Sequence, residues 1–242
     1  LSQVQSQLVA WAFYAAYFVG SIIFFLISLK SDVLQKFGYK KTLSAGLLLS
    51  AVGSFFFFSA ATMESFPFFL TALFTVGLGF SIQQIVANPL AIKMGSPTTG
   101  AHRLTLAGGV NSFGTTIGAI LLGIALFGMG DNKKTDLSLE DIKLPFIILG
   151  LAFILVAIFM NFSKIEDPAK IEEEAVIEHK HAKFSILDYP QLYLGMLGIF
   201  IYVGTEVTII SNLPALLKTQ EFGGILEDAI APFIALYWGS LM

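Results

Sequence analysis

The sequence has no cysteine and few charged residues. Among its 242 residues there is no Cys, and Asp, Glu, Lys and Arg together make up 13% of the chain, about half the share that soluble domains carry. The absence of cysteine excludes a disulfide framework and a thiolate metal site. The net charge of −3 and the lack of a long Lys/Arg run argue against a nucleic-acid partner.

Apolar residues dominate instead. They form 55% of the chain, Phe alone occurs 24 times, and the mean hydropathy is +0.78. A helix needs about 20 mostly apolar residues to cross a bilayer, because its backbone groups find no water there. Runs of this kind cover residues 8–29, 43–62, 68–92, 104–127, 144–162 and 192–217, and a seventh starts near residue 230. We therefore expect an all-α integral membrane protein in contact with lipid.

The connections between these runs alternate in basic residues. Lysines gather between the first two runs and after the fifth, and Lys93 and Arg103 lie between the third and the fourth. Connections rich in Lys and Arg face the cytoplasm, so these three are expected inside. This orientation places residue 1 outside, which predicts a further helix before it.

A short internal repeat points in the same direction. Residues 229–240 match residues 10–21 at several Ala, Gly and Ser positions, although coincidence in an apolar sequence rich in Ala and Gly is the alternative. A real repeat predicts two six-helix halves, as in many transporters. The expected domains are an N-terminal half without its first helix (1–162), a cytoplasmic linker (163–189) and the start of the C-terminal half (190–242).

Amide side chains interrupt the third and fourth runs. Gln83 and Gln84 lie about 15 Å before the basic end of the third run, and Asn88 follows Gln84 by one helical turn. Asn111 lies about 12 Å into the fourth run, at a similar depth. Such amides can hydrogen-bond one helix to the next, or they can bind a hydroxyl-rich solute, because an amide both donates and accepts. Their shared depth favours a substrate-binding site.

Glu206 is the only carboxylate well inside any run. A charged group within the membrane is costly, so such residues are functional candidates by default. Tyr202 lies one helical turn earlier and is placed to donate a hydrogen bond to it. We expect this pair to couple an ion or a proton to transport. The alternative is an acid near the outer mouth that a partner on another helix neutralises.

Proline and glycine residues mark the same two runs. Pro89 leaves the carbonyl of Ile85 without its helical partner, which a membrane tolerates only against protein or a wet cavity. Gly108, Gly109 and Gly114 permit close approach and bending of the fourth run. These glycines can equally serve packing alone.

Patterns typical of enzymes are absent from the sequence. It contains no hydrolase triad, phosphate-binding loop or dinucleotide fingerprint. His179 and His181 beside Glu178 form a weak metal pattern that a solvated linker explains better. We expect no enzyme activity, no cofactor and no bound metal.

Several segments together resemble one family. VANPLAIKMG (86–95) followed by HRLTLAGGVNSFGTTIG (102–118) is similar to the corresponding segments of the fucose:proton symporter-like family of the major facilitator superfamily. LQKFGYKKTLSAGLLL (34–49) resembles that family's loop between helices two and three, and YVGTEV and LYWGSLM fit helices seven and eight. The resemblance implies a partial major facilitator fold: helices two to six, seven and the start of eight of a twelve-helix plan.

The resemblance also implies a function. It is the import of a monosaccharide, a hexose or deoxyhexose, by alternating access across the bacterial inner membrane, coupled to a proton or a sodium ion, by a protein that is monomeric when complete. On these motifs Gly38, Lys40, Pro89 and Arg103 take gating or structural roles, as do the glycines of the fourth run. The alternative is a non-transporting membrane scaffold or receptor subunit that keeps the fold.

Two positions depart from the family's pattern. Asn111 matches an asparagine that faces the sugar cavity in the family, but Gln84 stands where the fucose member carries a protonatable glutamate. Gly108 replaces a glutamine of the family motif. Coupling through the third run is therefore in doubt, and Glu206 is the remaining visible acid for it.

Overall fold

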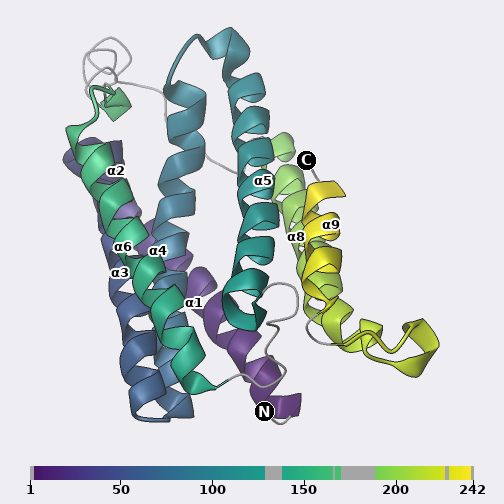
Figure 1. Cartoon of the computed structure of the whole chain (residues 1–242). Coiled ribbons are helices and arrows are strands. Elements are labelled where there is room, and N and C mark those ends of the chain that lie inside the picture. The colour runs from purple at the N-terminus through teal and green to yellow at the C-terminus, as the bar shows by residue number, and fades with distance from the viewer. Residues whose placement is uncertain (1–2, 129–137, 166, 170–188, 227–228, 241–242) are drawn as a thin grey trace, which may run out of the picture. The chain divides into compact units, whose positions relative to one another are not determined.

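The computed structural model describes residues 3–128, 138–165, 167–169, 189–226 and 229–240, and the regular structure in these ranges is helical (Figure 1). This confirms the all-α class. The long helices are α1 (Gln3–Lys30), α3 (Tyr39–Thr62), α4 (Phe66–Lys93), α5 (Gly100–Phe127), α6 (Leu139–Phe162) and α8 (Pro190–Leu217). The short elements are α2 (Val33–Phe37), η1 (Pro97–Thr99), η4 (Gln220–Phe222) and α9 (Ala231–Ser240).

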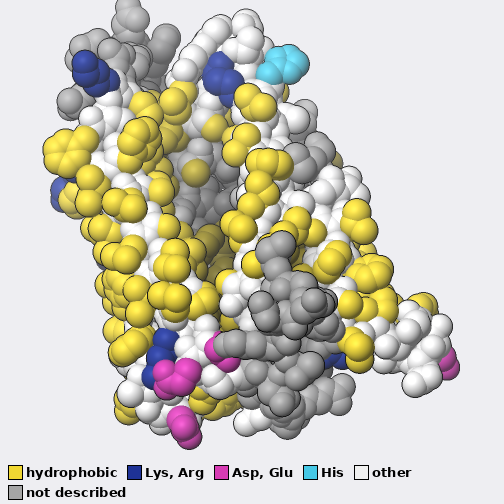
Figure 2. Space-filling view, viewed as in Figure 1, with side chains coloured by type: hydrophobic (Ala, Val, Ile, Leu, Met, Phe, Trp, Pro, Cys, Tyr) yellow, Lys and Arg dark blue, Asp and Glu magenta, His cyan; other side chains and the backbone are white. Residues whose placement is uncertain are grey.

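Six of the helices, α1, α3, α4, α5, α6 and α8, are long and apolar enough to cross a membrane. They coincide with the six complete apolar runs of the sequence, and the seventh run forms α9. Figure 2 shows hydrophobic side chains over the exposed helix faces, with charged side chains near the helix ends. A lipid environment accounts for this distribution, since water would not tolerate so much exposed apolar surface. The chain is part of a multi-pass membrane protein.

Contacts between residues group the chain into two units. Unit 1 comprises residues 1–108 and 136–175, and unit 2 comprises residues 109–135 and 176–242, so the division falls within α5. It does not coincide with the boundaries expected from the sequence, which stay a prediction. Residues 170–188 of the expected linker lie outside the described residues. The two units are described separately below.

Unit 1 is built around α3, which packs against both α4 and α6, while α1 packs on the other side of α4 (Figure 1). Small residues allow the close approach of α3 and α4. A Cβ atom on Gly79 would lie 2.7 Å from the backbone oxygen of Gly46 and 2.7 Å from the backbone nitrogen of Ser50. The helices of this unit are therefore held by close backbone contact, as is common in membranes.

Two apolar clusters fill the ends of unit 1. In one, the buried Phe57 of α3 stacks on Phe146 of α6 with 3.9 Å between ring centroids and meets Phe69 of α4 edge-on at 4.9 Å. The other cluster joins Tyr39, Val86, Leu90 and Ala169. This second cluster lies where α3 begins and α4 ends, at the lysine-bearing end of both helices.

Unit 2 contains the second part of α5 with α8 and α9. A Cβ atom on Gly123 of α5 would lie 2.9 Å from the Cβ of Ala231, so α9 approaches α5 closely. The sequence repeat pairs Ala16 of α1 with Ala235 of α9, and both are buried, at 0% and 6% exposure. The shared burial agrees with the repeat, because equivalent helices bury equivalent faces.

Candidate substrate-binding site

Helix α4 presents two amides on one exposed face. It runs without interruption through Pro89 to Lys93, and the side chains of Gln84 and Asn88, four residues apart, are both exposed. At 1.5 Å per residue, Gln84 lies about 14 Å from Lys93, well inside a hydrocarbon core of about 30 Å. Two exposed amides at that depth need polar partners, which water or a polar solute can supply.

The neighbouring Gln83 has a different environment. Its Nε2 donates to the Oγ of Ser50 at 2.7 Å and to the backbone oxygen of Gly46 at 3.3 Å, and both acceptors belong to α3. The amide nitrogen of Gln83 is therefore occupied in joining two helices. Of the two readings of these amides, the structure favours helix association for Gln83 and leaves Gln84 and Asn88 available to a solute.

The fourth expected site residue, Asn111, is exposed on α5. It belongs to unit 2, whereas Gln84 and Asn88 belong to unit 1, so a shared site of these residues stays a prediction. Among the described residues, no atom would lie within 4 Å of a Cβ atom on Gly108, Gly109 or Gly114 of the same helix. Close packing at these glycines is not seen here, and their gating role is still a prediction.

Arg103 holds the start of α5 to the end of α4. Its Nε donates to the backbone oxygen of Ala91 at 2.9 Å, and its Nη2 donates to the backbone oxygens of Ser96, at 3.0 Å, and Ile92. Its Nη1 donates to the Oγ1 of Thr99 at 2.6 Å. The last carbonyls of a helix lack partners within the helix, and the guanidinium group supplies them at the end of α4. This geometry agrees with the structural role expected for Arg103.

Gly38 and Lys40 lie at the start of α3. Gly38 separates α2 from α3 with φ +81°, a left-handed conformation that favours glycine. The Nζ of Lys40 donates to the backbone oxygen of Ser163 at 2.6 Å, just beyond α6. Lys40 therefore joins the start of α3 to the segment that follows α6, and Gly38 forms the turn between α2 and α3, which agrees with a structural role for both.

Glu206 lies half-buried in α8. The hydroxyl group of Tyr237 in α9 donates to the backbone oxygen of Glu206 at 3.2 Å. Tyr202, the partner suggested by the sequence, is 56% exposed on α8. Sequence reasoning missed Tyr237, because nothing in the sequence pairs a residue of LYWG with one of GTEV. The roles of Glu206 and Tyr202 in ion coupling stay predictions.

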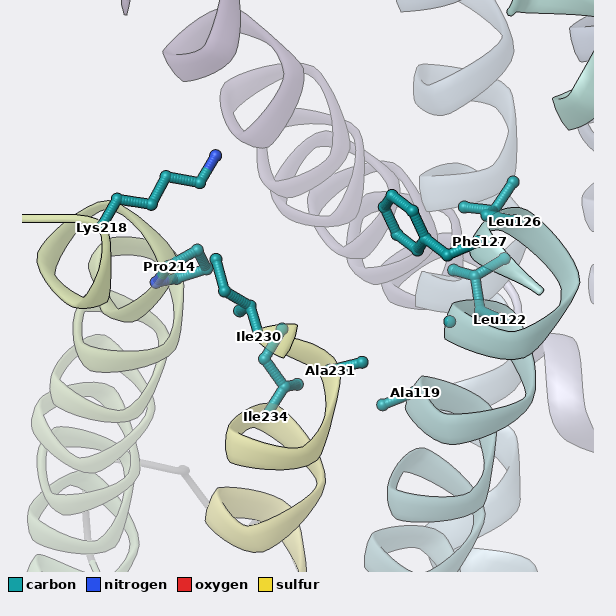
Figure 3. Close-up of a pocket in the computed structure, with 10 residues that line it drawn as sticks. Ala119, Leu122, Leu126, Phe127, Pro214, Lys218, Ile230, Ala231 and Ile234 are labelled. Atoms are coloured by element: carbon teal, nitrogen blue, oxygen red, sulfur yellow. The ribbon is translucent and has the colours of Figure 1, made fainter. Parts of the chain in front are cut away.

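A cavity of about 350 Å³ opens in unit 2 between α5, α8 and α9. Figure 3 shows Ala231 and Ala119 pointing toward each other. Pro214 and Lys218 line the side of the cavity away from α5. Nine of its ten lining residues are apolar or glycine, and Lys218 is the remaining one. A sugar needs several hydrogen-bonding partners, so this cavity does not suit it, and the exposed amides of α4 are the better candidates.

Within the described ranges, no group of three or more His, Asp or Glu side chains could hold a metal ion. His179 and His181 lie outside those ranges.

Comparison with known proteins decides the family. The sequence model of the Major Facilitator Superfamily matches residues 2–242. The chain belongs to the major facilitator superfamily. The partial major facilitator fold that the resemblance implied is thereby confirmed.

Relatives of this major facilitator chain include named sugar transporters. It is 32% identical over its full length to a glucose/galactose transporter of Brucella abortus, of which it covers 57%, and 31% identical to a putative glucose/galactose transporter of Helicobacter pylori, of which it covers 58%. Over 88% of its length it is 26% identical to the L-fucose-proton symporter of Escherichia coli, of which it covers 51%. These relatives confirm the resemblance to the fucose:proton symporter-like family.

The chain spans about half the length of the curated relatives it matches. No solved structure matches it. The activity of the complete protein is therefore a matter for proposal.

Proposed function

We propose that the complete protein imports a monosaccharide by alternating access, coupled to a proton or a sodium ion, across the bacterial inner membrane. The observation that carries this proposal is the exposed pair Gln84 and Asn88 on α4. Family membership supports it, since relatives of the chain are named sugar transporters. The complete protein acts as a monomer and needs no enzyme activity.

The pair suits a sugar for chemical reasons. Each amide offers a carbonyl oxygen and an NH2 group, which match the donor and acceptor character of a sugar hydroxyl. Gln84 and Asn88 lie one helical turn apart on the same face, so together they can bind adjacent hydroxyls of one ring. Neither side chain can titrate at physiological pH, so we assign them to the sugar rather than to a coupling proton.

Glucose and galactose are the first sugars to test, followed by L-fucose. The relatives named for glucose and galactose are 30 to 32% identical over the whole chain, against 26 to 29% over 84 to 88% of it for the L-fucose-proton symporters. Gln84 replaces the glutamate that the fucose member carries, which also argues against a fucose-type mechanism. Radiolabelled uptake into cells that express the complete protein, with competition by each sugar, measures the specificity.

Variants of the three α4 amides test the site. Gln84→Ala and Asn88→Ala are each expected to raise the sugar KM at least tenfold, because each removes a hydrogen-bonding partner of the sugar. Gln83→Ala is the matched control: its amide nitrogen is bonded to α3, so it should lower stability and raise the KM much less than either of the other two variants, acting only through the position of α4. Equal KM changes in all three variants would contradict this assignment.

Ion coupling is tested at Glu206. Glu206→Gln removes the charge of the half-buried acid in α8, and we expect loss of sugar accumulation against a gradient while equilibrative exchange continues. Glu221→Gln, at an exposed site in η4, is the control. Wild-type accumulation by Glu206→Gln under both proton and sodium gradients would show that coupling resides elsewhere. If no sugar raises the thermal stability of the purified protein, the scaffold alternative is favoured.

A further inference from the structure

Helix α3 begins without a cap of its own. The residue at its N-cap position is Gly38, which has no side chain to offer, and the first N–H groups of a helix need partners from outside it. Asp167, which follows α6, supplies them from 128 residues away. Its Oδ1 accepts from the backbone nitrogen of Tyr39 at 3.0 Å, and its Oδ2 accepts from that of Lys40 at 3.2 Å. Asp167 thereby fixes the position of Tyr39.

The carboxylate of Asp167 is itself closely held. Its Oδ1 also accepts from the backbone nitrogen of Ala169 at 3.2 Å, and a Cβ atom on Gly38 would collide with Oδ2. The side chain is partly buried between these groups. Asp167 therefore lies in a site that only glycine at position 38 leaves open.

Tyr39 in turn holds α4 at two places. Its side chain is 3% exposed and packs in the cluster that contains Val86 and Leu90 of α4. Its hydroxyl oxygen accepts from the Nζ of Lys93, the last residue of α4, at 2.6 Å. A shift of Tyr39 would thus be transmitted to α4 through packing and through a hydrogen bond.

The two anchored residues of α4 lie opposite its exposed amides. Val86 and Leu90 each follow an amide, Gln84 or Asn88, by two residues, and two residues turn a helix by about 200°. Contact of Tyr39 with Val86 and Leu90 therefore sets the rotation of α4 that turns Gln84 and Asn88 outward. We propose that Asp167, acting through Tyr39, is a positioning residue for the sugar-binding amides of α4.

The first test is a split between KM and maximal rate, and it rests on the proposed sugar transport. In the complete protein, Asp167→Ala is expected to raise the sugar KM about fivefold or more, with the maximal rate per folded molecule within about twofold of the wild type. Asp167→Asn keeps one acceptor oxygen and should give a smaller rise in KM. A role in folding alone would reduce the amount of protein and leave the KM unchanged.

Asp32 provides the matched control. It is also a cap, accepting from the backbone nitrogens of Leu34 at 3.0 Å and Gln35 at 3.1 Å, but it serves the short helix α2 and is exposed. Asp32→Ala should leave the KM unchanged. A wild-type KM in Asp167→Ala, or the same increase in Asp32→Ala, would overturn the proposal.

A second variant follows the path to α4. Tyr39→Phe removes only the hydroxyl that accepts from Lys93, and it should raise the KM by less than Asp167→Ala does. Because both act on one path, the double variant should show a KM close to that of Asp167→Ala rather than the product of the two effects. Independent, multiplying effects would refute a shared path. If the Asp167→Ala protein is not produced in folded form, the KM values of Asp167→Asn, Tyr39→Phe and their double variant are compared instead.

A readout without transport separates this inference from the proposed function. The chain contributes no cysteine, so Asn88→Cys, in a complete protein freed of its other cysteines, gives one site for a water-soluble maleimide. Adding Asp167→Asn should change the labelling rate at least threefold, while labelling of Thr71→Cys, distant on the same helix, should not change. If the wild type transports no sugar, the proposed function is wrong. The labelling rate at position 88 still tests whether Asp167 positions α4. Unchanged labelling at position 88 would refute the positioning role.

Discussion

Helices α3 and α5 are similar in hydropathy, yet they have different surroundings. Half of the residues in the apolar window of α3 are buried, whereas none are in that of α5. Glycine shows the same contrast. Gly46 of α3 faces the backbone of Gly79 in α4, while a Cβ atom on Gly114 or Gly118 of α5 would have no described atom within 4 Å. Hydropathy thus predicts where a helix resides but not what covers it.

The physical reason is that lipid provides no hydrophobic force between helices. Association in a bilayer depends on close packing of small residues and on interhelical hydrogen bonds, both of which require a specific partner. Helices α3 and α4 have such partners within unit 1. Substitutions in these helices test how far this contrast holds in the complete protein.

The largest effect is expected at Gly79. Gly79→Val places methyl groups against the backbone of Gly46 and Ser50, at which even a Cβ atom would be too close. Overpacking of this kind should lower the free energy of unfolding by about 3 kcal/mol. Thermal unfolding of the purified complete protein in detergent measures it. A melting temperature equal to that of the wild type would show that α3 and α4 are not closely packed.

A smaller effect is expected at the junction between the packed and the open helix. Arg103→Lys keeps the charge but cannot reproduce the planar fork that binds Ala91, Ser96 and Thr99. We expect a loss of about 2 kcal/mol of stability, because charge-assisted hydrogen bonds are lost. The adjacent and exposed His102→Ala is the control and should unfold as the wild type does. Equal stability of the two variants would show that Arg103 does not hold α5 to α4.

Two asparagines sharpen the contrast at the level of single hydrogen bonds. The Nδ2 of Asn161 in α6 donates to the Oγ of Ser44 in α3 at 2.9 Å, whereas that of Asn212 in α8 donates to the backbone oxygen of Thr208 in its own helix at 2.8 Å. Asn161→Ala should cost about 1 kcal/mol, in the range of interhelical hydrogen bonds in membranes. Asn212→Ala should cost less, and thermal unfolding compares the two. The reverse order would contradict this account.

The smallest effect is expected at Gly114. A Cβ atom at Gly114 would meet no described atom within 4 Å, so Gly114→Val should change the stability by no more than about 0.5 kcal/mol. The same thermal unfolding experiment serves as the counterpart of Gly79→Val. A loss of stability as large as that at Gly79 would show that α5 is as closely packed in the complete protein as α3 is. The difference in packing between α3 and α5 would then not hold in the complete protein.

Much of the helical architecture could be predicted from the sequence. The apolar runs gave the six candidate spans, and Pro89 lies within α4 as expected. The distinction between the adjacent Gln83 and Gln84 could not be predicted, because it depends on how α3 is placed against α4. Asp167 could not be linked to Tyr39 either, since 128 residues separate them and no sequence pattern joins a residue beyond α6 to the start of α3.

The sequence by itself determined that this chain resides in a membrane, which segments cross it, and that amides and one acid interrupt them. These are local properties, because about 20 consecutive residues decide whether a segment is stable in lipid. Only the tertiary structure decided that Gln83 bonds to α3, that Gln84 and Asn88 remain exposed, and that Asp167 holds Tyr39 against α4. A hydrogen bond between helices depends on the relative placement of distant segments, and local sequence does not specify that placement.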